Sequence, residues 1–252
     1  IPATTTYNST FEVYDWLVLN NSDSAYYPYM QPLHYQSCAP TSGQLFDDTP
    51  EVGAAWDSVR GNFTFTSNSV IGDGTNDCIS TTELSDPDVY VQLNSSINNT
   101  STGRAVGIVL RRNPSTGEHL LIQLNTTTDN ITINSHNGTS YTQRSSVTIA
   151  IAADANFSKL LGSSVIDSSV SGYFCVGSGS TQTVSTSYTS AANTFFSQNN
   201  TDHGIRFGTD GTTAAKFIRF YAMGNDDEYA NLSNFFSQGD NGTKRIRQIY
   251  SQ

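Results

Sequence analysis

Short β-prone runs separated by turn-forming pairs are the feature that most limits how this chain can fold. The turn pairs are Asp73-Gly74, Asn113-Pro114, Asn137-Gly138, Asp210-Gly211 and Asn241-Gly242. Between them lie runs rich in Val, Ile, Thr, Tyr and Phe, and the clearest expected strands are Asn62–Thr66, Val89–Leu93, Ala105–Arg112, His119–Leu124, Ile131–Ser135, Val147–Ala152, Gly172–Val176 and Lys216–Met223. This spacing, with hardly any helical periodicity, predicts an all-β jelly roll of two packed antiparallel sheets.

The remaining elements are expected to be few. Residues 11–19 are predicted to form a further strand, and the two short helices expected are Asp154–Leu161 and Glu228–Phe236. The low-complexity segment Thr181–Asn200 is predicted to be a long surface loop. No linker divides the chain, so residues 1–252 are expected to form a single β-jelly-roll domain.

Alternation along the expected strands indicates which side chains share a face. In Ala105–Arg112 one face is expected to carry Val106, Ile108, Leu110 and Arg112, and the other Gly107, Val109 and Arg111. His119 and Gln123 likewise share a face of the next strand. Such faces fit a concave polar sheet that grips a sugar chain, and they equally fit an ordinary solvent-exposed face.

Asn-x-Ser/Thr sequons are unusually dense. Thirteen begin at Asn8, Asn20, Asn62, Asn94, Asn98, Asn99, Asn125, Asn130, Asn137, Asn156, Asn199, Asn231 and Asn241. The triplet at Asn113 is excluded because Pro114 blocks it. An attached glycan requires a surface position in a secreted chain, so the density predicts an extracellular protein carrying N-linked glycans. The alternative is that abundant Ser, Thr and Asn produce these triplets by chance.

Charge and cysteine content restrict the partners. A net charge of −10 argues against nucleic acid and anionic membranes. No apolar stretch is long enough to span a bilayer, and the amino terminus resembles a mature start left after signal cleavage. The three cysteines favour one disulfide, expected between Cys38 and Cys78, with Cys175 left over.

The order of several segments resembles the jelly-roll alginate lyases, a family of extracellular polysaccharide lyases. The segments that carry the resemblance are Asp15-Trp16-Leu17-Val18-Leu19, Thr81-Thr82-Glu83-Leu84-Ser85, Ile108-Val109-Leu110-Arg111-Arg112, His119-Leu120-Leu121-Ile122-Gln123-Leu124, Gly172-Tyr173-Phe174-Cys175-Val176-Gly177 and Phe217-Ile218-Arg219-Phe220-Tyr221. It implies a concanavalin-like β-jelly roll that acts on or binds an extracellular polysaccharide.

The chain departs from the family's motifs at the residues that carry the chemistry. Thr81 and Ser85 replace the arginines that flank the family's glutamate, so only Glu83 carries over. Cys175 stands where the family has a strand lysine, and Gly179 where it has the reactive tyrosine. A jelly roll can retain its fold without the activity.

Cleavage of a uronate polymer by β-elimination needs a neutralised carboxylate, a base and an acid. Candidate catalytic residues are Arg111 or Arg112 for the carboxylate, His119 as base, and Tyr173 or Tyr221 as acid. Candidate substrate-binding residues are Glu83, Gln123 and Arg219.

No cofactor is required by this chemistry, and Ca²⁺ is the one cation that the sequence leaves open. Its candidate ligands lie in Asp47-Asp48, in residues 82–88 and in Asp226-Asp227-Glu228, which also fit solvated loop charges. The sequence is therefore compatible with two functions. The first is a secreted glycoprotein that binds or cleaves a polysaccharide. The second is a non-catalytic structural or attachment glycoprotein, such as a filament subunit, a cell-wall or viral surface domain, or a lectin-like protein.

Overall fold

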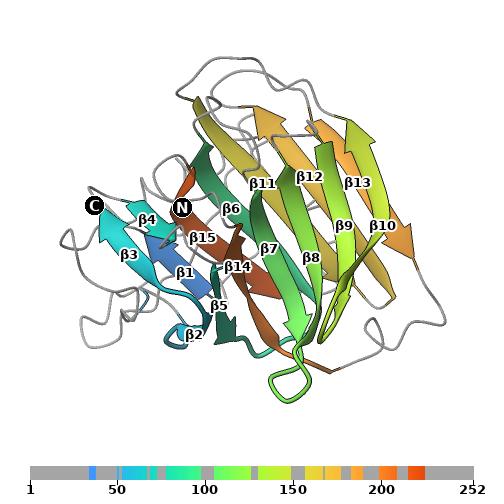
Figure 1. Ribbon diagram of the computed structural model, residues 1–252, viewed down its shortest axis with the longest axis horizontal. Helices are drawn as coiled ribbons and strands as arrows, with labels where there is room; N and C mark the ends of the chain where they lie inside the picture. The colour runs from blue at the N-terminus through green and yellow to red at the C-terminus, as the bar shows by residue number, and fades with distance from the viewer. Residues whose placement is uncertain are drawn as a thin grey trace, which may run out of the picture.

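The computed structural model describes fifteen β-strands and no helix within the residues that it places. These are residues 34–37, 50, 53–66, 69–72, 78–97, 105–125, 130–148, 157–166, 168–176, 183–189, 199–208 and 215–224. The strands form two antiparallel sheets (Figure 1).

The first sheet has seven strands in the order β10-β9-β8-β7-β14-β5-β2. Their bounds are β2 Asp57–Arg60, β5 Cys78–Glu83, β7 Ala105–Arg112, β8 Glu118–Asn125, β9 Asn130–Asn137, β10 Tyr141–Thr148 and β14 Asp202–Phe207. Strands β7 to β10 are consecutive hairpins, whereas β14 inserts between β7 and β5 from a distant part of the chain.

The second sheet has eight strands, in the order β13-β12-β11-β6-β15-β4-β3, and β1 also pairs with β15. Their bounds are β1 His34–Ser37, β3 Phe63–Thr66, β4 Ser69–Gly72, β6 Val89–Ile97, β11 Phe157–Ile166, β12 Ser169–Val176, β13 Thr183–Thr189 and β15 Ala215–Gly224.

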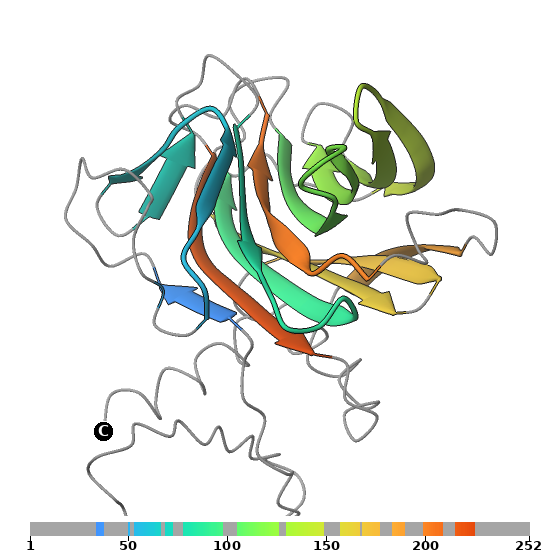
Figure 2. The ribbon, with the colours of Figure 1, turned by 90° about the horizontal axis from the view of Figure 1, so that it is seen from below.

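The two sheets stack face to face and enclose the main hydrophobic core (Figure 2). Val106, Ile108 and Leu110 of β7 are fully buried on the core side, as alternation predicted. They share the core cluster with Leu93 and Phe220 of the eight-stranded sheet. Burying one such side chain contributes about 1.5–3 kcal/mol, so this interior layer holds the sandwich together.

The predicted jelly roll is confirmed, with two local corrections. Residues 157–161 of the expected helix Asp154–Leu161 belong to strand β11, which pairs with both β6 and β12. Hydrogen-bonded pairing with a strand on each side outweighs the weak helical pattern of this segment. The expected loop Thr181–Asn200 contains strand β13, because Thr and Tyr side chains suit a pleated surface even where Ser is frequent.

The expectations that lie outside the described residues include the strand at 11–19, the helix Glu228–Phe236 and Cys38. Cys78 is buried, and its thiol donates to the carbonyl oxygen of Asn62 at 3.5 Å. The pairing of Cys38 with Cys78 therefore stays a prediction.

Candidate functional site

The outer face of the seven-stranded sheet, opposite the main core, carries the candidate site. Ile79, Val109 and Leu121 form a second, smaller apolar cluster there, on β5, β7 and β8, with β14 lying between β5 and β7. Tyr141 and Val59 pack against this cluster. Polar side chains from β5, β7, β8, β10 and β14 share the same face, so hydrogen-bonding groups surround this small apolar cluster.

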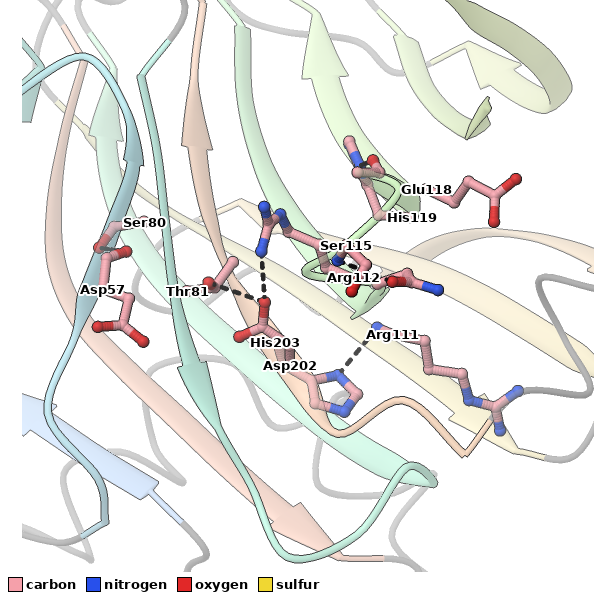
Figure 3. A network of polar contacts seen from close by, with 12 residues as sticks. Asp57, Ser80, Thr81, Arg111, Arg112, Ser115, Glu118, His119, Asp202 and His203 are labelled. Atoms are coloured by element: carbon pink, nitrogen blue, oxygen red, sulfur yellow. Dashed lines mark hydrogen bonds and ion pairs between the residues drawn. The ribbon is translucent and has the colours of Figure 1, made fainter. Parts of the chain in front are cut away.

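A β-bulge in β7 places Arg112 on this face. Asp202 of β14 pairs with Arg112, but Gly204 pairs with Val109, so β7 has one residue more than β14 in this interval. Arg111 takes up the extra residue with φ 48°, a left-handed conformation that costs a non-glycine residue about 1–2 kcal/mol. Simple alternation predicted that Arg112 shares the face of Leu110. The bulge turns it to the opposite face, beside Asp202 and Thr81 (Figure 3).

Arg111 itself is buried, with 3% of its surface exposed, and is held by a set of structural contacts. Its guanidinium pairs with Asp88 and its Nε donates to the carbonyl of Pro87 at 2.9 Å. Its backbone N–H donates to Nδ1 of His203 at 3.4 Å. The two adjacent arginines thus have different surroundings, and only Arg112 lies with the outer-face groups.

Arg112, Asp202 and Thr81 form a connected polar group. Arg112 Nη1 donates to Asp202 Oδ2 at 2.9 Å, and Thr81 Oγ1 donates to the same oxygen at 3.0 Å. Burial raises the pKa of Asp202, although the hydrogen bonds from Arg112 and Thr81 act in the opposite direction. The side chain of Arg112 is 15% exposed, so part of it faces solvent.

His119, His136 and Tyr141 form an aromatic group at one end of the face. The rings of His119 and His136 stack with centroids 4.6 Å apart, and the Tyr141 ring lies 4.4 Å from that of His136. His119 Nδ1 lies 2.8 Å from the carbonyl oxygen of Gly117, which can only accept, so Nδ1 carries the proton. His119 Nε2 therefore accepts from the Tyr141 hydroxyl at 3.1 Å.

Burial holds His119 in its neutral form. It lowers the pKa of His119 to about 3, and the nearby positive charges of Arg112 and Arg206 act in the same direction. The hydrogen bond to Gly117 opposes this shift. At neutral pH the imidazole is thus an uncharged hydrogen-bonding group.

Gln123 and Arg206 extend the polar face from β8 and β14. Arg206 Nη1 donates to Gln123 Oε1 at 2.8 Å, and the Arg206 guanidinium carbon lies 5.3 Å from the centre of the Tyr141 ring. We use the name outer-face cluster for Thr81, Arg112, His119, Gln123, Tyr141, Asp202 and Arg206.

The sequence-predicted site residues fall into separate places. Arg112, His119 and Gln123 belong to the outer-face cluster, and Glu83 is exposed at the end of β5, in register with Asp202. Tyr173 lies in β12, and Arg219 and Tyr221 lie in β15, both strands of the eight-stranded sheet. The structure therefore does not bring these last three positions together with Arg112 and His119.

Four members of the outer-face cluster were missed: Thr81 as a site residue, Tyr141, Asp202 and Arg206. A signal existed for Tyr141, because the Asn137-Gly138 turn predicts a hairpin whose returning strand begins there. The segment Asp202–Phe207 was not recognised as a strand, and its alternation would have placed Asp202 and Arg206 on one face.

A metal site finds little support within the described residues, where no group of three or more His, Cys, Asp or Glu side chains converges. In the candidate stretch 82–88, Asp88 pairs with Arg111 and its N–H bonds to the Asp86 carboxylate. The candidate ligands Asp47-Asp48 and Asp226-Asp227-Glu228 lie outside the described residues. The described part of the chain contains no helix that could cross a bilayer.

Comparison with known proteins supports the fold. No protein-family model and no curated protein matches the sequence. Among solved structures, the carbohydrate-binding module CBM66 from Bacillus subtilis has a TM-score of 0.52 at 15% identity, covering 67% of this chain and 94% of the module. The Ca²⁺-bound exoplasmic/lumenal domain of VIP36 has a TM-score of 0.55 at 14% identity, covering 78% of this chain and 92% of that domain.

A third similar structure is a mutant of the GH43 protein BlXynB from Bacillus licheniformis, with a TM-score of 0.51 at 10% identity over 76% of this chain and 39% of that one. At these identities the likeness concerns the fold, which is a concanavalin-like jelly roll. No family model supports the resemblance to alginate lyases.

Proposed function

We propose that the protein is a secreted glycoprotein that binds an extracellular polysaccharide through the outer-face cluster. The observation that carries the proposal is that one sheet face holds Arg112, Gln123 and Tyr141 on three of its strands. The jelly-roll neighbours support it, since one is a carbohydrate-binding module and another, VIP36, has also been solved with mannose-containing ligands.

The chemistry of the cluster suits a saccharide. A sugar offers hydroxyls that need donors and acceptors, and C–H faces that pack on an aromatic ring; Tyr141 supplies such a ring. Arg112 donates one N–H to Asp202 and keeps further donors of its planar fork for a ligand. A guanidinium matches a carboxylate in geometry and charge, so we favour a uronate-containing chain over a neutral one.

The binding proposal can be tested with immobilised polyuronate and a neutral glucan as probes. Arg112→Ala is expected to weaken polyuronate binding about tenfold or more, because a charge-assisted hydrogen bond contributes about 1.5–3 kcal/mol. Arg144→Ala is the matched control: it removes the same charge from the same sheet, but Arg144 contacts Ser135 and Tyr188 instead of the cluster. Equal effects of both variants, or no binding by the wild type to either polymer, would contradict the proposal.

A β-eliminating lyase is the second candidate, favoured by the hydrogen bond between His119 and Tyr141 on the face that holds Arg112. In this scheme Arg112 binds the uronate carboxylate and His119 Nε2 takes the C5 proton. The electron pair of the former C5–H bond forms the C4=C5 double bond. The C4–O bond breaks and its electron pair stays on the leaving oxygen, which Tyr141 protonates. Tyr141 then has the role expected of Tyr173 or Tyr221.

Binding ranks above catalysis because a pKa of about 3 makes His119 a weak base. The two functions separate in one assay, since β-elimination creates an unsaturated product that absorbs ultraviolet light. If a polyuronate binds and this absorbance does not appear, the lyase function is contradicted. The function that remains is that of a lectin-like or attachment glycoprotein.

A further inference from the structure

We propose that Asn137 carries an N-linked glycan, at the tip of the β9–β10 hairpin beside the outer-face cluster. Asn137-Gly138-Thr139 is an acceptor triplet, and all three residues are exposed. The neighbouring residue His136 stacks on His119, so the attachment point borders the proposed binding face.

The hairpin fixes which end of the Asn137 amide is available. Oδ1 accepts from the N–H of Thr139 at 3.0 Å and of Ser140 at 2.8 Å, and from the Ser140 hydroxyl at 3.4 Å. The described residues offer no hydrogen-bond partner to Nδ2, the atom that becomes glycosylated, or to the Thr139 hydroxyl, which an acceptor triplet also requires. The hydrogen bonds of the turn therefore occupy Oδ1 and, within the described residues, leave Nδ2 available for modification.

The modification itself needs a lipid-linked diphospho-oligosaccharide as the donor and a transferase. The Nδ2 nitrogen attacks C1 of the first sugar and loses one proton to a base of the transferase. The C1–O bond breaks, and the lipid diphosphate leaves with its electron pair. The product is an N-glycosidic bond at Nδ2, while Oδ1 of the same amide stays bonded to the turn.

The neighbouring hairpin supplies an internal control. Asn113, between β7 and β8, accepts through Oδ1 from the N–H of Ser115 at 2.9 Å and of Thr116 at 3.2 Å, in the same arrangement. Only Pro114 separates Asn113-Pro114-Ser115 from an acceptor triplet. The two tips also touch, since a side chain on Gly138 would collide with the carbonyl of Thr116.

The experiment uses the full chain secreted from a glycosylating eukaryotic cell, with peptide mapping before and after enzymatic release of N-glycans. The Asn137 peptide is expected to be glycosylated, and the Asn113 peptide unmodified. Asn137→Asp keeps the accepting oxygen and removes the acceptor nitrogen, so it should lose one glycan in mass while folding normally. Thr139→Ala should lose the same glycan and Thr139→Ser should retain it.

Pro114→Ala provides the converse test, because it should add a glycan at Asn113. Recovery of an unmodified Asn137 peptide from folded, secreted protein that is glycosylated elsewhere would overturn the proposal. If the secreted chain carries no glycan at any position, the proposal fails too. The inference rests on the glycoprotein part of the proposed function, but both outcomes are independent of polysaccharide binding, so the glycan and the proposed binding can fail separately.

Discussion

His119 is the residue whose surroundings most restrict how the outer face can work. Its two ring nitrogens are both committed, one to the carbonyl of Gly117 and the other to the hydroxyl of Tyr141. A ligand must break one of these bonds to use the imidazole, whereas Arg112 has donors to spare. Recognition is therefore expected to rest on Arg112 and on the Tyr141 ring, with His119 holding that ring in place.

Tyr141→Phe should lower the free energy of unfolding by about 1–3 kcal/mol. The substitution keeps the ring that packs against the smaller apolar cluster, but it leaves His119 Nε2 as a buried acceptor without its donor. Urea denaturation of the two proteins at neutral pH measures the difference. A change below about 0.5 kcal/mol would show that the hydroxyl bond does not contribute to folding stability.

At the scale of the element, the bulge in β7 decides which arginine meets the ligand. A strand without the extra residue would direct Arg112 toward the core with Leu110. Sequence alternation alone gave that expectation, because a non-glycine residue carries no local signal for φ above zero. The contacts that fix Arg111 come from the β5–β6 connection and from β14, which are distant in sequence.

The bulge predicts an inverted order of stability for two variants of Arg111. Both Arg111→Gly and Arg111→Ala lose the ion pair with Asp88, but only glycine adopts φ near 48° without a steric penalty. Arg111→Gly should therefore be more stable than Arg111→Ala by about 1 kcal/mol, the reverse of their usual order within a strand. Thermal unfolding of the pair gives the comparison, and a more stable alanine variant would mean that the backbone has left the left-handed region.

At the scale of the whole molecule, the sequence predicted the two packed sheets better than it predicted which strand belongs to which sheet. The faces of β7 and β8 follow from alternation, because successive side chains of a strand point to opposite faces, and alternate residues from Val106 to Leu110 and from Leu120 to Leu124 join the main core. The assignment of a strand to a sheet depends on pairings across the chain, such as β14 with β5 and β7. For this reason Tyr173 and Tyr221 were grouped with His119 although they belong to the other sheet.

Three of the four buried histidines, His34, His119 and His203, predict that the whole fold loses stability in mild acid. Burial lowers the pKa of each to about 3, whereas each returns to about 6.5 in the unfolded chain. Above pH 6.5 both states bind no proton at these sites, and their contribution to stability is complete. As the pH falls from 6.5 toward 3, only the unfolded state takes up protons, so stability is lost.

Each histidine contributes a slope of about 1.4 kcal/mol per pH unit in that window, and the raised pKa of Asp202 offsets part of it at the acidic end. Urea unfolding at a series of pH values between about 7 and 4 should show the steep decline. His34→Gln should reduce the slope by about one third whatever it does to the stability at neutral pH, because it removes one of the three histidines whose pKa burial lowers. A free energy of unfolding that stays constant from pH 7 to pH 5 would show that these histidines take up protons in the folded protein.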